Sequence, residues 1–219
     1  MEFIEFIKTN RIKGAVFDMD GTLTDSMTRW SEIYAVLSGY LKTELPQGFM
    51  MEVNHIPMRG RVKKIIDGLS LDFDEKEVYN YWVSKAAEYY EKVFKVKPYM
   101  LEAIKALKVC GVKCLIATAS DKACAEAFIR SNNLEEYFDG VVGLDEVSRP
   151  KNFPDIYLKA AEKLGVQPSE CIVFEDALTA IRSAKSGGFK VCGVQDDCSV
   201  NDSEEIKTVS DFILGFSDC

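Results

Sequence analysis

The chain has 219 residues, of which 47% are hydrophobic and 28% charged, a balance typical of a soluble globular enzyme rather than of a disordered or fibrous protein. Asp and Glu number 35 against 27 Lys and Arg, so the formal net charge is -8 and a nucleic-acid backbone would be repelled. No apolar run approaches the roughly 20 residues that a membrane-spanning helix needs. We therefore expect neither nucleic acid nor a membrane as a partner.

The N-terminal segment, residues 1–8, places acids among its apolar residues and lacks the basic start and small-residue cleavage site of a secretory signal. We expect it to form the first turns of a helix. The seven cysteines contain no CxxC pair, and three of them fall inside apolar strand-like runs, as core residues do in a reducing compartment. These features predict a cytoplasmic protein. The sequence does not constrain the oligomeric state, and a monomer is the default expectation.

Short apolar runs rich in Val, Ile and Phe alternate along the chain with segments of helical periodicity. This alternation predicts an α/β fold with a Rossmann-like, doubly wound parallel sheet covered by helices on both faces. Helices are expected to open at Pro98 and to span 154–164. The strand-like runs are three strong ones at 14–17, 112–117 and 171–174 and three weaker ones at 141–142, 191–194 and 212–214.

Between residues 24 and 96 the strand pattern disappears and aromatic-rich helical periodicity replaces it, as at Val78, Tyr81 and Trp82. This change predicts an inserted all-α domain whose aromatic stripe packs internally. We therefore divide the chain into a core domain, residues 1–23 and 97–219, and an inserted helical domain, residues 24–96. The two crossings, near residues 22–25 and 94–98, are candidate hinges.

Acidic residues gather where two of the strong strands end. Asp18-Met19-Asp20-Gly21-Thr22 follows the first strand, and Glu175-Asp176 ends the third. Carboxyl ends of parallel strands share one edge of a sheet, so these four acids would repel one another unless a cation lay among them. Oxygen ligands suit Mg²⁺, and the single histidine of the chain supplies neither a multi-histidine metal site nor a Ser-His-Asp triad. The pattern predicts a magnesium site.

The order of these motifs resembles the haloacid dehalogenase superfamily of phosphohydrolases. Its DxDGT motif matches Asp18 to Thr22, and Thr118, then Lys151, then Glu175-Asp176 follow in the family's order. The helical insertion after the first motif is similar to the α-helical cap of the subgroup that contains β-phosphoglucomutase, phosphoglycolate phosphatase and small sugar phosphatases. The resemblance spans nearly the whole chain.

The resemblance implies a role for each matching residue. Asp18 would be the nucleophile that becomes an aspartyl phosphate, and Asp20 the general acid and base. Thr118, Ala119 and Lys151 would bind the phosphoryl oxygens. The run from Thr118 to Asp121 is also expected to cap the helix that begins near Lys122.

The resemblance also implies a metal shell and a reaction. Mg²⁺ would be bound by Asp18, the main-chain carbonyl of Asp20, and Asp176, with Glu175 in or near the shell. The implied reaction is Mg²⁺-dependent hydrolysis of a small phosphorylated metabolite, a phosphosugar or a similar phosphate monoester.

Several points stay open at the level of sequence. Lys151 lacks the proline that commonly follows this lysine in the family, so Arg149 is an alternative phosphate ligand, and Ser120 competes with Thr118. Within the segment 55–61 of the inserted domain, His55 and Arg59 are candidates for substrate recognition.

Two other functions compete with hydrolysis. A phosphosugar mutase of the β-phosphoglucomutase type would use the same nucleophile but return the phosphoryl group to sugar, and water exclusion would decide between the two. A phospho-aspartate signalling module is a more distant alternative, because such modules are shorter and place their acidic pair before the phosphorylated aspartate. The physiological substrate is not readable from the sequence.

Overall fold

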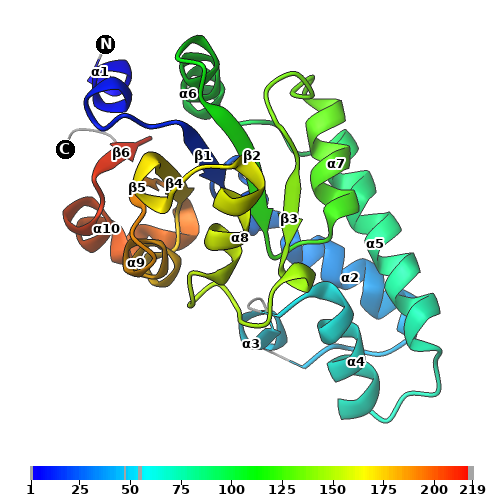
Figure 1. The fold of residues 1–219 in the computed structure, drawn as a ribbon. Helices are drawn as coiled ribbons and strands as arrows, with labels where there is room; N and C mark the ends of the chain where they lie inside the picture. Colours follow the sequence, from blue (N-terminus) through cyan, green and yellow to red (C-terminus); the bar gives the residue numbers. More distant parts are fainter. Residues whose placement is uncertain (1, 47, 54–55, 217–219) are drawn as a thin grey trace.

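A six-stranded parallel sheet, in the order β3-β2-β1-β4-β5-β6, forms the centre of the protein (Figure 1). The computed structural model describes residues 2–46, 48–53 and 56–216. All six predicted strands are confirmed, the three weak ones included. Their bounds are β1 Gly14–Phe17, β2 Lys113–Thr118, β3 Val141–Gly143, β4 Cys171–Glu175, β5 Lys190–Val194 and β6 Phe212–Leu214.

The central strands β1 and β4 are buried on both faces, which explains why they are nearly continuous apolar runs, whereas β6 at the edge is partly exposed. In β1, Ala15 and Phe17 point into one hydrophobic cluster and Val16 into the other. Helices α1 (Glu2–Thr9), α6 (Pro98–Val109) and α7 (Lys122–Ser131) contribute to the first cluster, and α8 (Asp155–Leu164), α9 (Leu178–Ser186) and α10 (Ser203–Val209) to the second. The predicted doubly wound α/β fold is therefore confirmed.

Local signals account for the ends of several core helices. Pro98 occupies the first turn of α6, where its missing N–H costs nothing. The side chain of Asp121 accepts a hydrogen bond from the N–H of Ala123 and caps α7, so the run 118–121 does cap this helix as expected. Gly165 ends α8 in the left-handed conformation at φ 71°. Short 3-10 helices are η1 Met27–Arg29, η2 Leu144–Glu146, η3 Pro168–Glu170 and η4 Asp197–Asp202.

The insertion between β1 and α6 is helical. It contains α2 (Trp30–Leu41), α3 (Phe49–Val53), α4 (Met58–Gly68) and the long α5 (Glu75–Lys92), which lies along α7 of the core (Figure 1). Val78 and Trp82 of α5 are fully buried, in agreement with the expected internal packing of this stripe. Within the described ranges, no helix combines the length and apolar character needed to cross a membrane.

The two crossings between insertion and core run side by side. Thr24 forms an antiparallel bridge with Val96, and the N–H of Lys97 donates to the carbonyl of Leu23 over 2.9 Å. The insertion is thus joined to the core through two paired segments rather than through two separate loops.

The ammonium of Lys97 fastens this junction to the sheet. The Lys97 side chain is only 3% exposed, and its ammonium donates to the carbonyls of Gly21 at 2.6 Å and Gln195 at 2.9 Å. It also pairs with the buried Asp196 at 3.2 Å and with the exposed Asp25 at 2.9 Å. One buried cation therefore links the first crossing, the second crossing and the loop after β5.

Replacing Lys97 with methionine should destabilise the protein strongly. The substitution leaves Asp196 buried without its cation, and breaking a buried pair from one side typically costs about 3 kcal/mol or more. Urea denaturation followed by circular dichroism would measure the loss. Lys95→Met, two residues away and exposed, is the matched control and should change stability by less than about 0.5 kcal/mol. Equal midpoints for the two variants would contradict this role of Lys97.

Candidate active site

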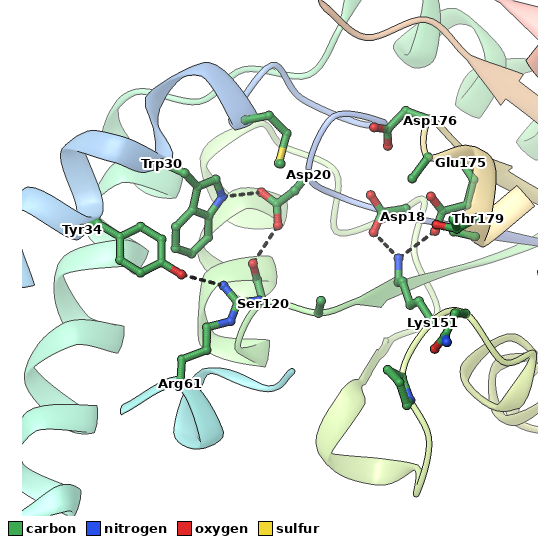
Figure 2. A pocket seen from close by; sticks show the side chains of 16 residues that line it. Asp18, Asp20, Trp30, Tyr34, Arg61, Ser120, Lys151, Glu175, Asp176 and Thr179 are labelled. Atoms are coloured by element: carbon green, nitrogen blue, oxygen red, sulfur yellow. Dashed lines mark hydrogen bonds and ion pairs between the residues drawn. The ribbon is translucent and has the colours of Figure 1, made fainter. Parts of the chain in front are cut away.

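The order of the strands places a crevice at the carboxyl ends of β1 and β4. The chain runs outward from β1 through β2 to β3 and then continues on the other side of β1 with β4. The strand order therefore reverses between β1 and β4, and open parallel sheets bind ligands at such a reversal. A pocket of about 630 Å³ lies there (Figure 2). Its walls include Asp18, Asp20, Ala119, Ser120, Lys151, Glu175 and Asp176 from the core, and Met27, Trp30, Tyr34 and Arg61 from the insertion.

Three buried carboxylates meet at one end of this pocket. Asp18, Glu175 and Asp176 each offer an oxygen, and the three oxygens lie within 4.8 Å of one another. The ammonium of Lys151 pairs with Asp18 and stands 2.8 Å from Oε1 of Glu175. Burial raises the pKa of Asp18 well above its usual value; the charge of Lys151 opposes this shift, and the neighbouring carboxylates add to it.

Asp176 is oriented by hydroxyl groups. Oγ1 of Thr22 donates to Oδ1 of Asp176 over 2.8 Å, and Oγ of Ser199 lies 3.4 Å from Oδ2. Burial, followed by the charge of Glu175, raises the pKa of Asp176 to about 7, although the bond from Thr22 acts in the opposite direction. Gly21 allows the turn after β1 to lie close to the Asp176 carboxylate, because it adopts φ +90° and a Cβ there would lie 2.5 Å from Oδ2 of Asp176.

The charge of this cluster fits a bound cation. When Asp18, Glu175 and Asp176 are all ionised, the ammonium of Lys151 balances only one of the three charges. The available donors are carboxylate oxygens, which hard divalent cations such as Mg²⁺ prefer. The residues present therefore could hold a metal ion.

The carboxylate of Asp20 points away from this cluster and toward the insertion (Figure 2). Its Oδ2 accepts a hydrogen bond from Oγ of Ser120 at 2.7 Å. Its Oδ1 accepts from Ser26 at 2.5 Å, from Nε1 of Trp30 at 3.3 Å and from the hydroxyl of Tyr90. Burial, followed by the charge of Asp20, raises the pKa of Tyr90 well above its usual value, so this hydroxyl acts as a donor. Sequence reasoning missed Ser26, Trp30 and Tyr90, because nothing in the sequence shows where the insertion packs.

The predicted phosphate-binding residues of the 118–121 run divide into two sets. Thr118, the last residue of β2, is fully buried, and its hydroxyl accepts a hydrogen bond from the N–H of Ser120 at 2.9 Å. Ala119 and Ser120 line the pocket itself. Ser120, considered above only as a competitor of Thr118, thus reaches Asp20.

Lys151 and Arg149 lie in different surroundings. Lys151 enters the pocket, whereas the exposed Arg149 pairs with Asp155 at 2.7 Å and covers the ring of Phe153. The structure therefore brings Lys151 into the carboxylate cluster. A second partner of that cluster, not expected from the sequence, is Tyr157, whose hydroxyl donates to Oε1 of Glu175 over 2.7 Å.

In the segment 55–61, the residue that lines the pocket is not one of the two expected to recognise the substrate. His55 lies outside the described residues. Arg59 is exposed on α4, with its guanidinium 4.9 Å from the ring centre of Tyr79. Arg61, by contrast, is 4% exposed, lines the pocket and lies 3.4 Å from the hydroxyl of Tyr34.

Comparison with known proteins identifies the family of the chain. The model of the haloacid dehalogenase-like hydrolases matches residues 12–188. The chain is 29% identical over 193 residues to the fructose-1-phosphate phosphatase YqaB of Escherichia coli (strain K12), covering 84% of this chain and 97% of that protein. It is 28% identical over 200 residues to the phosphorylated carbohydrates phosphatase of Thermotoga maritima, covering 89% and 90%.

Solved structures show the same fold. The structure of CbbY from Rhodobacter sphaeroides in complex with phosphate superposes with a TM-score of 0.78 at 21% identity and covers 93% of each chain. The structure of a hydrolase of the same family from Entamoeba histolytica superposes with a TM-score of 0.72 at 28% identity, again over 93% of each chain.

Mg²⁺ should stabilise the protein more at alkaline than at acidic pH. The folded-state pKa of Asp176, about 7, lies above its unfolded value of about 3.9. In that interval the metal-free folded state binds more protons than the unfolded chain, so its stability falls as the pH rises. A cation that replaces those protons acts most strongly above pH 7. Thermal unfolding with and without millimolar Mg²⁺, at about pH 5 and about pH 8, would measure the difference.

Two variants test whether this stabilisation belongs to the cluster. Asp176→Asn should abolish it, whereas Asp197→Asn, at an exposed position, should retain it. An identical response of the two variants to Mg²⁺ would place the cation elsewhere.

Proposed function

Because the chain is a hydrolase of the haloacid dehalogenase-like family, we propose that it is a Mg²⁺-dependent phosphatase of a small phosphorylated metabolite, a phosphosugar or a similar phosphate monoester. The observation that carries the proposal is the buried contact of Lys151 with Asp18, beside Glu175 and Asp176 in a pocket at the strand ends. The names of two relatives, a fructose-1-phosphate phosphatase and a phosphorylated carbohydrates phosphatase, support a phosphosugar as substrate.

The proposed reaction proceeds in two displacements at phosphorus. A carboxylate oxygen of Asp18 bonds to phosphorus while the bond to the leaving oxygen breaks, and Asp20 gives its proton to that oxygen. Water then attacks the aspartyl phosphate, Asp20 takes a proton from the water, and inorganic phosphate leaves with the carboxylate of Asp18 restored. Each residue therefore returns to its starting state.

In the first displacement, the negatively charged carboxylate of Asp18 approaches a phosphate group that is also negatively charged. Unit charges about 4 Å apart repel by about 1 kcal/mol in water and by several times more in a drier site. The ammonium of Lys151, already in contact with Asp18, lowers this barrier by neutralising charge next to the attacking oxygen. Mg²⁺, held by Asp18, the main-chain carbonyl of Asp20, and Asp176, with Glu175 in or near the shell, would supply further positive charge when bound.

The phosphoryl-binding roles follow the family resemblance. We assign them to Thr118, Ala119 and Lys151. Ala119 and Lys151 line the pocket, and the buried Thr118 accepts the N–H of Ser120, which supports the turn that carries Ala119. Residues 24–96 would act as a cap over the core formed by 1–23 and 97–219.

A mutase of the β-phosphoglucomutase type remains the second candidate, since it would use the same residues around Asp18. The two activities differ in the fate of the phosphoryl group, which reaches water in one and sugar in the other. Measuring both products separates them. A signalling module would instead retain the phosphoryl group after treatment with acetyl phosphate.

The proposal predicts that Asp18→Asn abolishes turnover, because an amide oxygen is a poor nucleophile, and that Asp20→Asn lowers turnover by about 10²-fold or more. The measurement is release of inorganic phosphate, together with isomerised sugar, from a panel of sugar phosphates, phosphoglycolate and nucleotides with Mg²⁺. Asp72→Asn, at an exposed position of the insertion, is the control. Full activity of either active-site variant would refute the assignment.

Substrate recognition should depend on Arg61 more than on Arg59. The buried guanidinium of Arg61 faces the pocket, so Arg61→Lys should raise KM about tenfold by removing the planar fork that can hold an anion or hydroxyl pair. Arg59→Lys, at an exposed position of the same helix, should leave KM within about twofold. The reverse order of the two effects would restore the sequence-based assignment to Arg59.

A further inference from the structure

The carboxylate of Asp20 is the point where the helical insertion touches the proposed chemistry directly. Trp30 on α2 and Tyr90 on α5 both donate to its Oδ1, and both belong to the insertion. We propose that Tyr90 and Trp30 are positioning residues that hold this carboxylate for proton transfer to the leaving group. The inference rests on the proposed function, in which Asp20 is the general acid and base.

The geometry fixes both oxygens of the carboxylate. Tyr90 is fully buried, and its hydroxyl lies 3.4 Å from Oγ of Ser120 while donating to Oδ1 of Asp20. Ser120 donates to the second oxygen, Oδ2, at 2.7 Å. Donors on both oxygens restrict rotation of the carboxyl group. In its ionised form, the form that takes a proton from water, these hydrogen bonds are about twice as strong as neutral ones. Asp20 is therefore held between a helix of the insertion and the loop after β2.

The position of Tyr90 depends in turn on how α5 lies against α7. Oγ of Ser131, at the end of α7, donates to the carbonyl of Tyr90 over 3.0 Å. The hydroxyl of Tyr79 donates to the carboxylate of Asp121, the cap of the same helix. α5 is thus tied to α7 at two points, and the hydroxyl of Tyr90 is aimed by the packing of two helices.

This arrangement predicts a selective effect of removing one hydroxyl. Tyr90→Phe keeps the ring and its edge contacts with Trp30 and Phe94 but deletes the bond to Asp20. A general acid contributes about 10²- to 10⁴-fold, and misplacing it should cost about tenfold in kcat. KM should stay within about twofold, because the Tyr90 hydroxyl binds Asp20 and is not expected to bind the substrate.

The test compares two leaving groups. A sugar phosphate, the fastest of the panel above, releases an alkoxide that needs a proton, whereas p-nitrophenyl phosphate releases a stable phenolate that does not. Tyr90→Phe and Trp30→Phe should lower kcat for the sugar phosphate about tenfold and leave the pre-steady-state release of p-nitrophenolate within about twofold. Tyr89→Phe, which removes a hydroxyl from the neighbouring position of α5, should change neither rate.

The outcomes separate the inference from the function on which it rests. Equal losses on both substrates, or a raised KM with unchanged kcat, would show that Tyr90 and Trp30 act only by packing, and would overturn the inference. Unchanged sugar-phosphate turnover in both variants, with turnover lost in Asp20→Asn, would overturn it too and leave the proposed function intact. Full activity of Asp20→Asn would remove the proposed function and this inference together.

Discussion

The structure of the site depends on the repulsion between three carboxylates, Asp18, Glu175 and Asp176, which are buried side by side at the ends of two adjacent strands. The parallel register pairs Phe17 with Phe174, so the residue after β1 and the last residue of β4 reach the same level. Burying several like charges is costly unless they are paired. Lys151 offsets one of them. Burial first, and then the charges of the neighbouring carboxylates, raise the pKa values of Asp18 and Asp176.

The rigid core is what makes such a cluster possible. Sheet strands that are buried on both faces cannot move apart to relieve the repulsion, since each is packed between two helical layers. The groups that orient the acids also come from elements fixed to the sheet. Tyr157 on α8 holds Glu175, and Thr22 in the turn after β1 holds Asp176. The stability of the core therefore supports the strained arrangement at its edge.

The sequence revealed those parts of the molecule that local pattern and general topology determine. Apolar runs located every strand, even the three-residue β6, and the rule that parallel strands end at one edge brought Asp18 and Asp176 together. Contacts between insertion and core could not be predicted in the same way. The donors to Asp20 from Trp30 and Tyr90 lie 10 and 70 residues from it. Tyr90 meets it because of how α5 packs on α7, and Trp30 because of how α2 packs on α5.

The choice between Arg59 and Arg61 shows the same limit on one helix. Two residues apart on an α-helix, they differ by about 200° around its axis, so only one of them faces the pocket. Which one does so is set by the contacts of α4 as a whole, where Val62 and Ile65 are buried beside Arg61. A basic segment in the sequence indicates recognition, but the packing of the helix selects the residue.

If residues 24–96 act as a moving cap, as proposed, the way they are joined to the core would link substrate access to the proposed proton transfer. Lys97 ties both crossings to the loop after β5, so any rigid movement of residues 24–96 has to pivot near this ammonium. Tyr90 and Trp30 lie on the moving side of such a pivot, and Asp20 lies on the fixed side. Movement away from the core would withdraw the Trp30 and Tyr90 donors from Oδ1 of Asp20, leaving the bond from Ser26 next to the first crossing, and return would restore them. The placement of the insertion and the orientation of the acid would then change together, because one set of hydrogen bonds carries both.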